Sequence, residues 1–151
     1  MIVFQEWCNN ASEKQQILDI EKSLFFKDAL TEKSLISVLE NPNAYVVLAK
    51  KDGIVVGYLF GYFSEMSETA DILKIAVIPE FQRQGLAVKM LEKYIYFLRK
   101  IKTDQLLLEV RETNVNAREF YEKSGFTMLG KRNDFYRFPV ENAVIFCYLL
   151  K

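Results

Sequence analysis

The sequence predicts an α/β (α+β) domain in which a mixed sheet is flanked by helices. The hydrophobic period changes along the chain between about 3.6 residues, typical of helix, and about 2 residues, typical of strand. The segments follow the order β-α-α-β-β-β-α-β-α-β-β, so about seven strands and about four helices share one sheet. A length of 151 residues fits one domain over residues 1–151.

Capping and breaking residues delimit the elements of the N-terminal half. Asn10 or Ser12 can cap the first helix, and Asn41 with Pro42 stops the second. The turn at 50–53 lies between two β-rich segments, which predicts a hairpin. The expected elements are a strand at 2–7, a helix at 9–26, a helix from Thr31 to Asn41, and strands at 44–49, 54–63 and 72–78, the last ended by Pro79.

The C-terminal half alternates helices and strands. Residues 85–101 place their apolar side chains on one face, as an amphipathic helix does. Gly125 is expected to close a shorter helix. The expected elements are helices at 85–101 and 114–124, strands at 105–111, 126–132 and 141–150, and a loop between the last two strands that holds Phe135, Tyr136 and Phe138.

Composition excludes several classes of chemistry. The chain has no histidine and only two cysteines, Cys8 and Cys147. Ser-His-Asp and Cys-His catalysis and four-ligand zinc sites are therefore excluded, and we expect no metal.

Charge and hydropathy set expectations about partners and location. The net charge is zero, which argues against nucleic acid. No signal peptide or membrane span is expected, so we expect a cytoplasmic protein that contacts no membrane. The oligomeric state is left open, although a monomer is plausible.

Residues 75–87, with the sequence IAVIPEFQRQGLA, have the pattern of an anion-binding turn. A strand ends near Pro79, and a helix begins after Gly85. The first N–H groups of a helix lack intrahelical partners, and the helix dipole favours an anion there. Gly85 allows the backbone to approach a ligand, and Arg83 adds a cation. The same pattern also fits a surface helix that merely begins at a glycine.

Two further residues are candidates for proton transfer. Glu109 lies in the middle of the expected strand at 105–111, on the same face as Leu107 and Arg111. It is either a functional carboxylate or one half of an ordinary ion pair with Arg111. Tyr121 lies late on the following helix and is either functional or a core aromatic residue.

These motifs together resemble the GCN5-related N-acetyltransferase (GNAT) superfamily. Gln82-x-x-Gly85-x-Ala87 after a Val77-x-Pro79 strand end is similar to its motif A. The block Leu108-Glu-Val-Arg111…Asn114…Phe120-Tyr121…Gly125-Phe126 and the tail Gly130-x-Arg132-x-x-Phe135-Tyr136…Glu141-Asn142-Ala143 resemble the RimI type, which acetylates the N-terminal alanine of a ribosomal protein. The resemblance is clear over residues 71–151.

The resemblance implies a GNAT fold, acetyl-CoA as cosubstrate and the N-terminus of a protein or peptide, such as a ribosomal protein, as acceptor. It implies a glutamate base at Glu109, a tyrosine acid at Tyr121, direct transfer in a ternary complex and an acceptor contact at Tyr136. The implied cofactor-binding positions are Ile75, Ala76 and Val77 for the acetyl-pantetheine arm, Arg83, Gln84, Gly85, Leu86, Ala87 and Val88 for the pyrophosphate, and Asn114.

The chemistry of these residue types agrees with the implied roles. An α-amine has a pKa of about 7.7–8.0, so it must lose a proton before it attacks a thioester. Glu109 can accept that proton, and Tyr121 can protonate the leaving thiolate.

The sequence departs from the family pattern mainly on the expected acceptor side. Phe135 replaces the first of two paired tyrosines, Asn142 replaces an acidic residue, and Asp28-Ala29 lies where a Trp-Ser pair is usual. The alternatives are therefore a relative that acts on a small-molecule amine or a lysine, and a catalytically silent acetyl-CoA-binding module.

Overall fold

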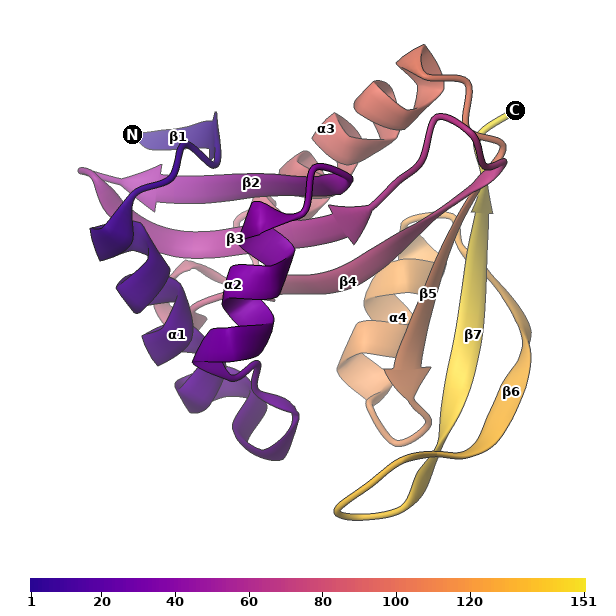
Figure 1. The fold of residues 1–151 in the computed structure, drawn as a ribbon. Helices are drawn as coiled ribbons and strands as arrows, with labels where there is room; N and C mark the ends of the chain where they lie inside the picture. Colours follow the sequence, from indigo (N-terminus) through magenta and orange to yellow (C-terminus); the bar gives the residue numbers. More distant parts are fainter.

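A computed structural model describes residues 1–151 (Figure 1). Seven strands form one sheet in the order β1-β2-β3-β4-β5-β7-β6, and only the β4–β5 pair is parallel. This mixed, mostly antiparallel sheet confirms the predicted fold class. The elements are β1 (Ile2–Glu6), α1 (Ala11–Phe25), the 3₁₀ turn η1 (Phe26–Asp28), α2 (Glu32–Glu40), β2 (Ala44–Lys51), β3 (Ile54–Tyr62), β4 (Thr69–Val77), the 3₁₀ turn η2 (Pro79–Phe81), α3 (Leu86–Lys100), β5 (Gln105–Arg111), α4 (Val115–Lys123), β6 (Thr127–Tyr136) and β7 (Glu141–Leu149).

Helices cover both faces of the sheet and give the protein two hydrophobic cores (Figure 1). On one face, α1 and α2 bury residues such as Ile17 and Leu35 against β2 and β3. On the other face, α3 packs Met90 and Leu98 against a larger cluster that also holds Tyr121 of α4. Helices α1 and α2 pack over β2, β3 and β4, which leaves this face of the C-terminal strands less covered (Figure 1).

The observed ends of the elements follow the expected caps. Asn10, not Ser12, caps α1, because its Oδ1 accepts hydrogen bonds from the amides of Ser12 at 2.9 Å and Glu13 at 3.1 Å. Thr31 caps α2 through the amide of Ser34. A side-chain acceptor of this kind satisfies one of the donors that a helix start leaves free.

Three strands are longer than the sequence predicts, and one of them, β2, gains only Lys50 and Lys51. Strand β4 begins at Thr69 rather than at residue 72, because its polar first residues pair with β5. Strand β6 continues to Tyr136, which pairs with Glu141 across the turn to β7. The prediction that Phe135 and Tyr136 lie in a loop is therefore wrong. Only Phe138 lies in the turn, and its side chain is 76% exposed.

Strands β4 and β5 stay together over a short seam and then separate. Their register pairs Thr69 with Gln105 and Asp71 with Leu107, and no later pair forms. Strand β4 nevertheless runs on to Val77 and β5 to Arg111. The result is a wedge-shaped opening in the middle of the sheet, between the C-terminal halves of the two strands. We call it the β4–β5 opening.

No helix of the protein combines the length and the apolar composition needed to cross a lipid bilayer.

Candidate active site

Main-chain groups of β4 face the β4–β5 opening. Ala76 pairs with Tyr58 of β3, and the amide of Ile78 donates to Val56 O at 2.9 Å. Backbone groups alternate in direction along a strand, so Ile75 and Val77 direct theirs away from β3 and into the opening. Gln82 Nε2 donates to Val77 O at 2.8 Å, which occupies that acceptor. The amide donors of Ile75 and Val77 are thus presented on an edge that no strand covers.

The turn before α3 and the first residues of α3 present six consecutive free amide donors. The N–H groups of residues 83–88 have no acceptor within the protein, and the first backbone bond of the helix is donated by Lys89 to Gly85 O. Arg83 and Gly85 both have left-handed backbone, with φ of 63° and 79°. Successive amides in such a turn form a concave anion-binding nest, and the dipole of α3 adds to its positive potential.

Gly85 fits this role for a conformational reason. A Cβ atom at this position would meet nothing within 4 Å, so space alone does not demand glycine. The positive φ favours it, because left-handed backbone costs glycine less than any residue with a Cβ atom.

Asn114 has a structural role at the start of α4. It caps α4, because its Oδ1 accepts a hydrogen bond from the amide of Ala117 at 3.2 Å. Its Nδ2 donor has no partner within the protein.

Glu109 and Tyr121 approach β5 from opposite faces. Leu106, Leu108 and Val110 of β5 are buried in the core beneath α3 and α4, so Glu109 lies on the face that carries α1 and α2. The Glu109 carboxylate is 3.5 Å from Arg132 Nε of β6 and is partly exposed. The ion pair with Arg111, one of the two alternatives for Glu109, is absent, because Arg111 pairs with Asp28 and Glu141 instead.

Tyr121 is buried among aromatic rings but keeps a free hydroxyl. Its ring packs edge-on against Phe120 and Phe126. The hydroxyl has no hydrogen-bond partner within the protein. Among side-chain oxygens and nitrogens that are fully shielded from solvent, only Thr103 Oγ1 lacks a partner, so the Tyr121 hydroxyl is not one of the shielded atoms. The Tyr121 hydroxyl therefore still reaches accessible space. Burial, and then the neighbouring Tyr136, raise the pKa of Tyr121 well above its usual value of 10.0.

Tyr136, at the end of β6, packs its ring beside Arg111 and Phe135. Burial raises the pKa of Tyr136 to about 12, and the next largest cause is the negative charge of Glu109. Tyr136 in turn contributes to the raised pKa of Tyr121. Tyr136 is therefore within electrostatic range of both Glu109 and Tyr121, which belong to opposite faces of β5.

Arg111 makes a set of long-range contacts in this region that no sequence pattern predicted. All five of its guanidinium N–H groups donate hydrogen bonds. The acceptors are Asp28 Oδ2 at 2.6 Å, Asp28 Oδ1 at 2.9 Å, Glu141 Oε1 at 3.1 Å, Arg137 O at 2.9 Å and Pro139 O at 3.1 Å. The guanidinium also lies 4.5 Å from the centre of the Tyr136 ring.

A hydrogen bond from Arg111 lowers the pKa of Asp28 from its usual 3.8. The Asp28–Arg111 pair is therefore fully ionised at neutral pH, and its contribution to stability is lost only as the pH falls below about 4. No local signal links the two residues, since they are 83 positions apart in the chain.

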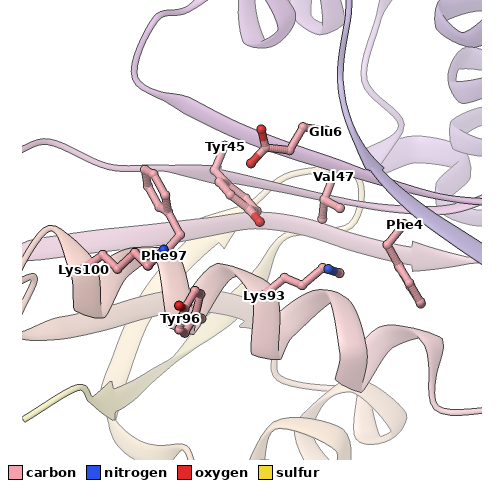
Figure 2. Close-up of a pocket in the computed structure, with 8 residues that line it drawn as sticks. All are labelled: Phe4, Glu6, Tyr45, Val47, Lys93, Tyr96, Phe97 and Lys100. Atoms are coloured by element: carbon pink, nitrogen blue, oxygen red, sulfur yellow. The ribbon is translucent and has the colours of Figure 1, made fainter.

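A surface groove of about 350 Å³ lies elsewhere, between α3 and strands β1 and β2 (Figure 2). Phe4, Tyr45 and Phe97 form its aromatic part, and Lys93 and Lys100 project from α3 along it. None of the residues around the β4–β5 opening lines this groove. The protein also has no group of three or more His, Cys, Asp or Glu side chains placed to hold a metal ion.

The decisive comparison is with a family profile. The Acetyltransferase (GNAT) family matches residues 10–126, more than three quarters of the chain. The chain belongs to the GNAT acetyltransferase family.

Individual relatives and solved structures agree with this membership. A ribosomal protein bS18-alanine N-acetyltransferase from Haemophilus ducreyi is 34% identical to this GNAT chain over 104 residues, which cover 67% of this chain and 70% of that protein. The crystal structure of the ribosomal-protein-S18-alanine N-acetyltransferase from Escherichia coli superposes with a TM-score of 0.87 at 25% identity, covering 100% of this chain and 95% of that one. NAA60 from Arabidopsis thaliana, solved with acetyl-CoA, has the same fold, with a TM-score of 0.84, 17% identity, and coverage of 99% of this chain and 98% of that one.

Proposed function

We propose that residues 1–151 form one acetyltransferase domain, which moves the acetyl group of acetyl-CoA to the N-terminal α-amine of a protein. The observation that carries this proposal is the β4–β5 opening, which has free amide donors on β4, an anion nest before α3 and the carboxylate of Glu109 on β5, with Tyr121 packed in the core against the other face of β5. Two proteins similar to this chain, described above, are named for acetylation of a ribosomal protein's N-terminal alanine, which supports the same acceptor class here.

The residues of the nest fit acetyl-CoA. Its pyrophosphate is an anion, and the free amides of 83–88 provide donors for it at the start of a helix. Gln84, Leu86, Ala87 and Val88 would contribute main-chain groups, and Arg83 would add a positive charge. The pantetheine arm would run along β4, where Ile75 and Val77 present amide donors on either side of Ala76. Asn114 offers its free Nδ2 from the start of α4.

Acetyl-CoA supplies the acetyl thioester in this proposal, and the chain supplies proton transfer and charge stabilisation. Glu109 accepts the proton that the α-amine must lose, directly or through one water. The amide of Ile75 or Val77 donates to the carbonyl oxygen as negative charge develops on it, an effect typically worth about 3 kcal/mol. Tyr121 donates its proton to the sulfur as the carbon–sulfur bond breaks and the carbon–nitrogen bond forms.

The high pKa of Tyr121 suits this role. A hydroxyl whose pKa is raised above 10 remains protonated at neutral pH, so the proton is available in every turnover. Tyr136, half-buried and within electrostatic range of Glu109, would contact the acceptor.

The test measures release of free thiol from acetyl-CoA by the purified chain. Three acceptors are compared: a peptide with a free N-terminal alanine, the same peptide with its N-terminus acetylated and a lysine inside, and a polyamine. We expect turnover only with the free N-terminus and a large loss of that turnover in Glu109→Gln. Turnover with the lysine peptide or the polyamine alone would refute the proposed acceptor but keep the acetyltransferase. Binding of acetyl-CoA without turnover of any acceptor would favour a silent binding module.

A further inference from the structure

Different interactions close the two ends of the β4–β5 opening. At the narrow end, backbone pairs join the strands, and Glu68 O accepts from the amides of Asp104 at 2.9 Å and Gln105 at 3.1 Å. At the wide end no backbone pair exists. There, the side chain of Arg111 reaches from the end of β5 to Asp28 of η1.

This contact is unique in the molecule. Of all the ion pairs, only Arg111–Asp28 joins residues 1–77 to residues 105–151. The same two residues also make the only side-chain hydrogen bonds between these two parts of the chain. The bidentate geometry, with two oxygens facing two nitrogens, fixes direction as well as distance.

Asp28 is itself held firmly to β4. Lys74 Nζ donates to Asp28 O at 2.7 Å and to Glu21 Oε1 at 2.6 Å. Glu21 is fully buried, and it also accepts hydrogen bonds from Tyr58 and from the amide of Leu30. The loop that carries Asp28 therefore cannot shift without breaking a buried network.

A continuous bridge thus spans the opening, from Lys74 on β4 through Asp28 to Arg111 on β5. Lys74 lies three residues beyond Asp71, the last paired residue of β4, which is about 10 Å along a strand. At this level β4 presents the amides of Ile75 and Val77, and β5 carries Glu109. The groups proposed to hold the thioester and to accept the amine proton are therefore on separate strands, and the only polar side-chain link between those strands is this bridge.

We propose that Arg111 and Asp28 are positioning residues, whose clamp fixes the separation between the proton acceptor on β5 and the thioester site on β4. The clamp also anchors the turn between β6 and β7, because Arg111 holds the carbonyls of Arg137 and Pro139. This inference rests on the proposed function. A displacement of about 1 Å between reacting groups can cost on the order of a hundredfold in rate, so the clamp acts on kcat rather than on binding of acetyl-CoA.

Two variants weaken the clamp while leaving the nest at 83–88 untouched. Arg111→Lys keeps the charge but loses the planar fork, which lysine cannot replace. Asp28→Asn keeps the shape of an exposed turn residue and removes its charge. The matched control is Lys131→Gln, which breaks the Lys131–Glu112 ion pair within the C-terminal part alone.

The experiment measures kcat with the N-terminal alanine peptide, the Kd of acetyl-CoA by calorimetry and the melting temperature for the wild type, the two clamp variants, their double variant and the control. We expect kcat to fall at least tenfold in both clamp variants, with the Kd of acetyl-CoA within twofold of wild type and Lys131→Gln unchanged. The double variant Asp28→Asn with Arg111→Lys should be no slower than the slower single variant, because both remove one interaction.

The outcomes separate this inference from the proposed function. If the wild-type chain does not acetylate the peptide, the proposed acceptor is refuted, and the clamp's role in that reaction is refuted with it. If the wild type is active and the clamp variants keep kcat within twofold, only the clamp is refuted. A parallel loss of kcat, acetyl-CoA affinity and melting temperature would also overturn it, since it would indicate a general structural role.

Discussion

The replacement Gly61→Ala tests whether the close packing of Tyr94 against Gly61 stabilises the sheet next to the β4–β5 opening. A Cβ atom at Gly61 would lie 2.4 Å from Cε2 and Cζ of Tyr94 and 2.5 Å from its hydroxyl. Tyr94 is fully buried, and its hydroxyl donates to Tyr62 O at 2.9 Å and Asp71 O at 3.1 Å. The ring therefore cannot move away without losing these bonds. Asp71 is also the last residue of β4 that pairs with β5.

The magnitude follows from two contributions. Overpacking a core typically costs about 1–3 kcal/mol, and loss of the Tyr94 hydroxyl's hydrogen bonding costs about 1 kcal/mol more. We expect Gly61→Ala to lower the free energy of unfolding by about 2–4 kcal/mol. For a chain of this size that lowers the melting temperature by about 5–15 °C.

Urea unfolding followed by circular dichroism measures the effect. The matched control is Gly130→Ala, where a new Cβ meets nothing within 4 Å and φ is not positive, so the change should stay within about 0.5 kcal/mol. The double variant Gly61→Ala with Tyr94→Leu should cost at least about 1 kcal/mol less than the sum of the single variants. Equal stabilities of the two glycine variants, or strict additivity in the double variant, would refute the reasoning.

Three further predictions concern the site and its support. Glu109→Gln should lower kcat on the order of a hundredfold or more and leave the calorimetric Kd of acetyl-CoA within twofold; loss of acetyl-CoA binding would contradict a role in proton transfer. With the alanine peptide, kcat/KM should rise with pH as the amine of pKa about 7.7–8.0 loses its proton. It should then stay level to about pH 10, because the pKa of Tyr121 is raised above that value. A fall in kcat/KM that begins near pH 8.5 would exclude Tyr121 as the acid. Glu21→Gln should lower the free energy of unfolding at pH 7 by about 3 kcal/mol, because it leaves the Lys74 ammonium without its carboxylate; wild-type stability in urea would disprove that.

Sequence periodicity predicts most of this fold because most elements have one buried face. Strand β5 is an example: alternate residues Leu106, Leu108 and Val110 are buried, and its predicted bounds at 105–111 are the observed ones. The start of β4 was missed because Thr69 and Asp71 are polar, and their strand conformation is set by pairing with β5 and β3. The end of β6 was missed for a similar reason, since Tyr136 is placed by its partner Glu141.

In the candidate site, too, local features were predicted from the sequence and long-range contacts were not. The anion nest was predicted locally, because a glycine between a strand end and a helix start is a short-range pattern. The roles of Glu109 and Tyr121 came from family resemblance, and the residues alone left both open. The Arg111–Asp28 clamp had no sequence signal, because its partners are 83 positions apart in the chain. Only the folded structure brings its five acceptors together.

The short seam between β4 and β5 also bears on self-association. An uncovered strand edge is a template on which another chain can pair, and proteins usually protect such edges. The outer edge strand β6 carries Lys131, Arg132 and Asp134, charges that discourage pairing. The inner edge of β4 ends in the apolar run Ile75–Val77 and has no such protection of its own. Its protection is geometric: an intruding strand would have to enter a wedge that is closed at one end and bridged at the other. The two closed ends of the opening therefore protect it against pairing with a second β-strand.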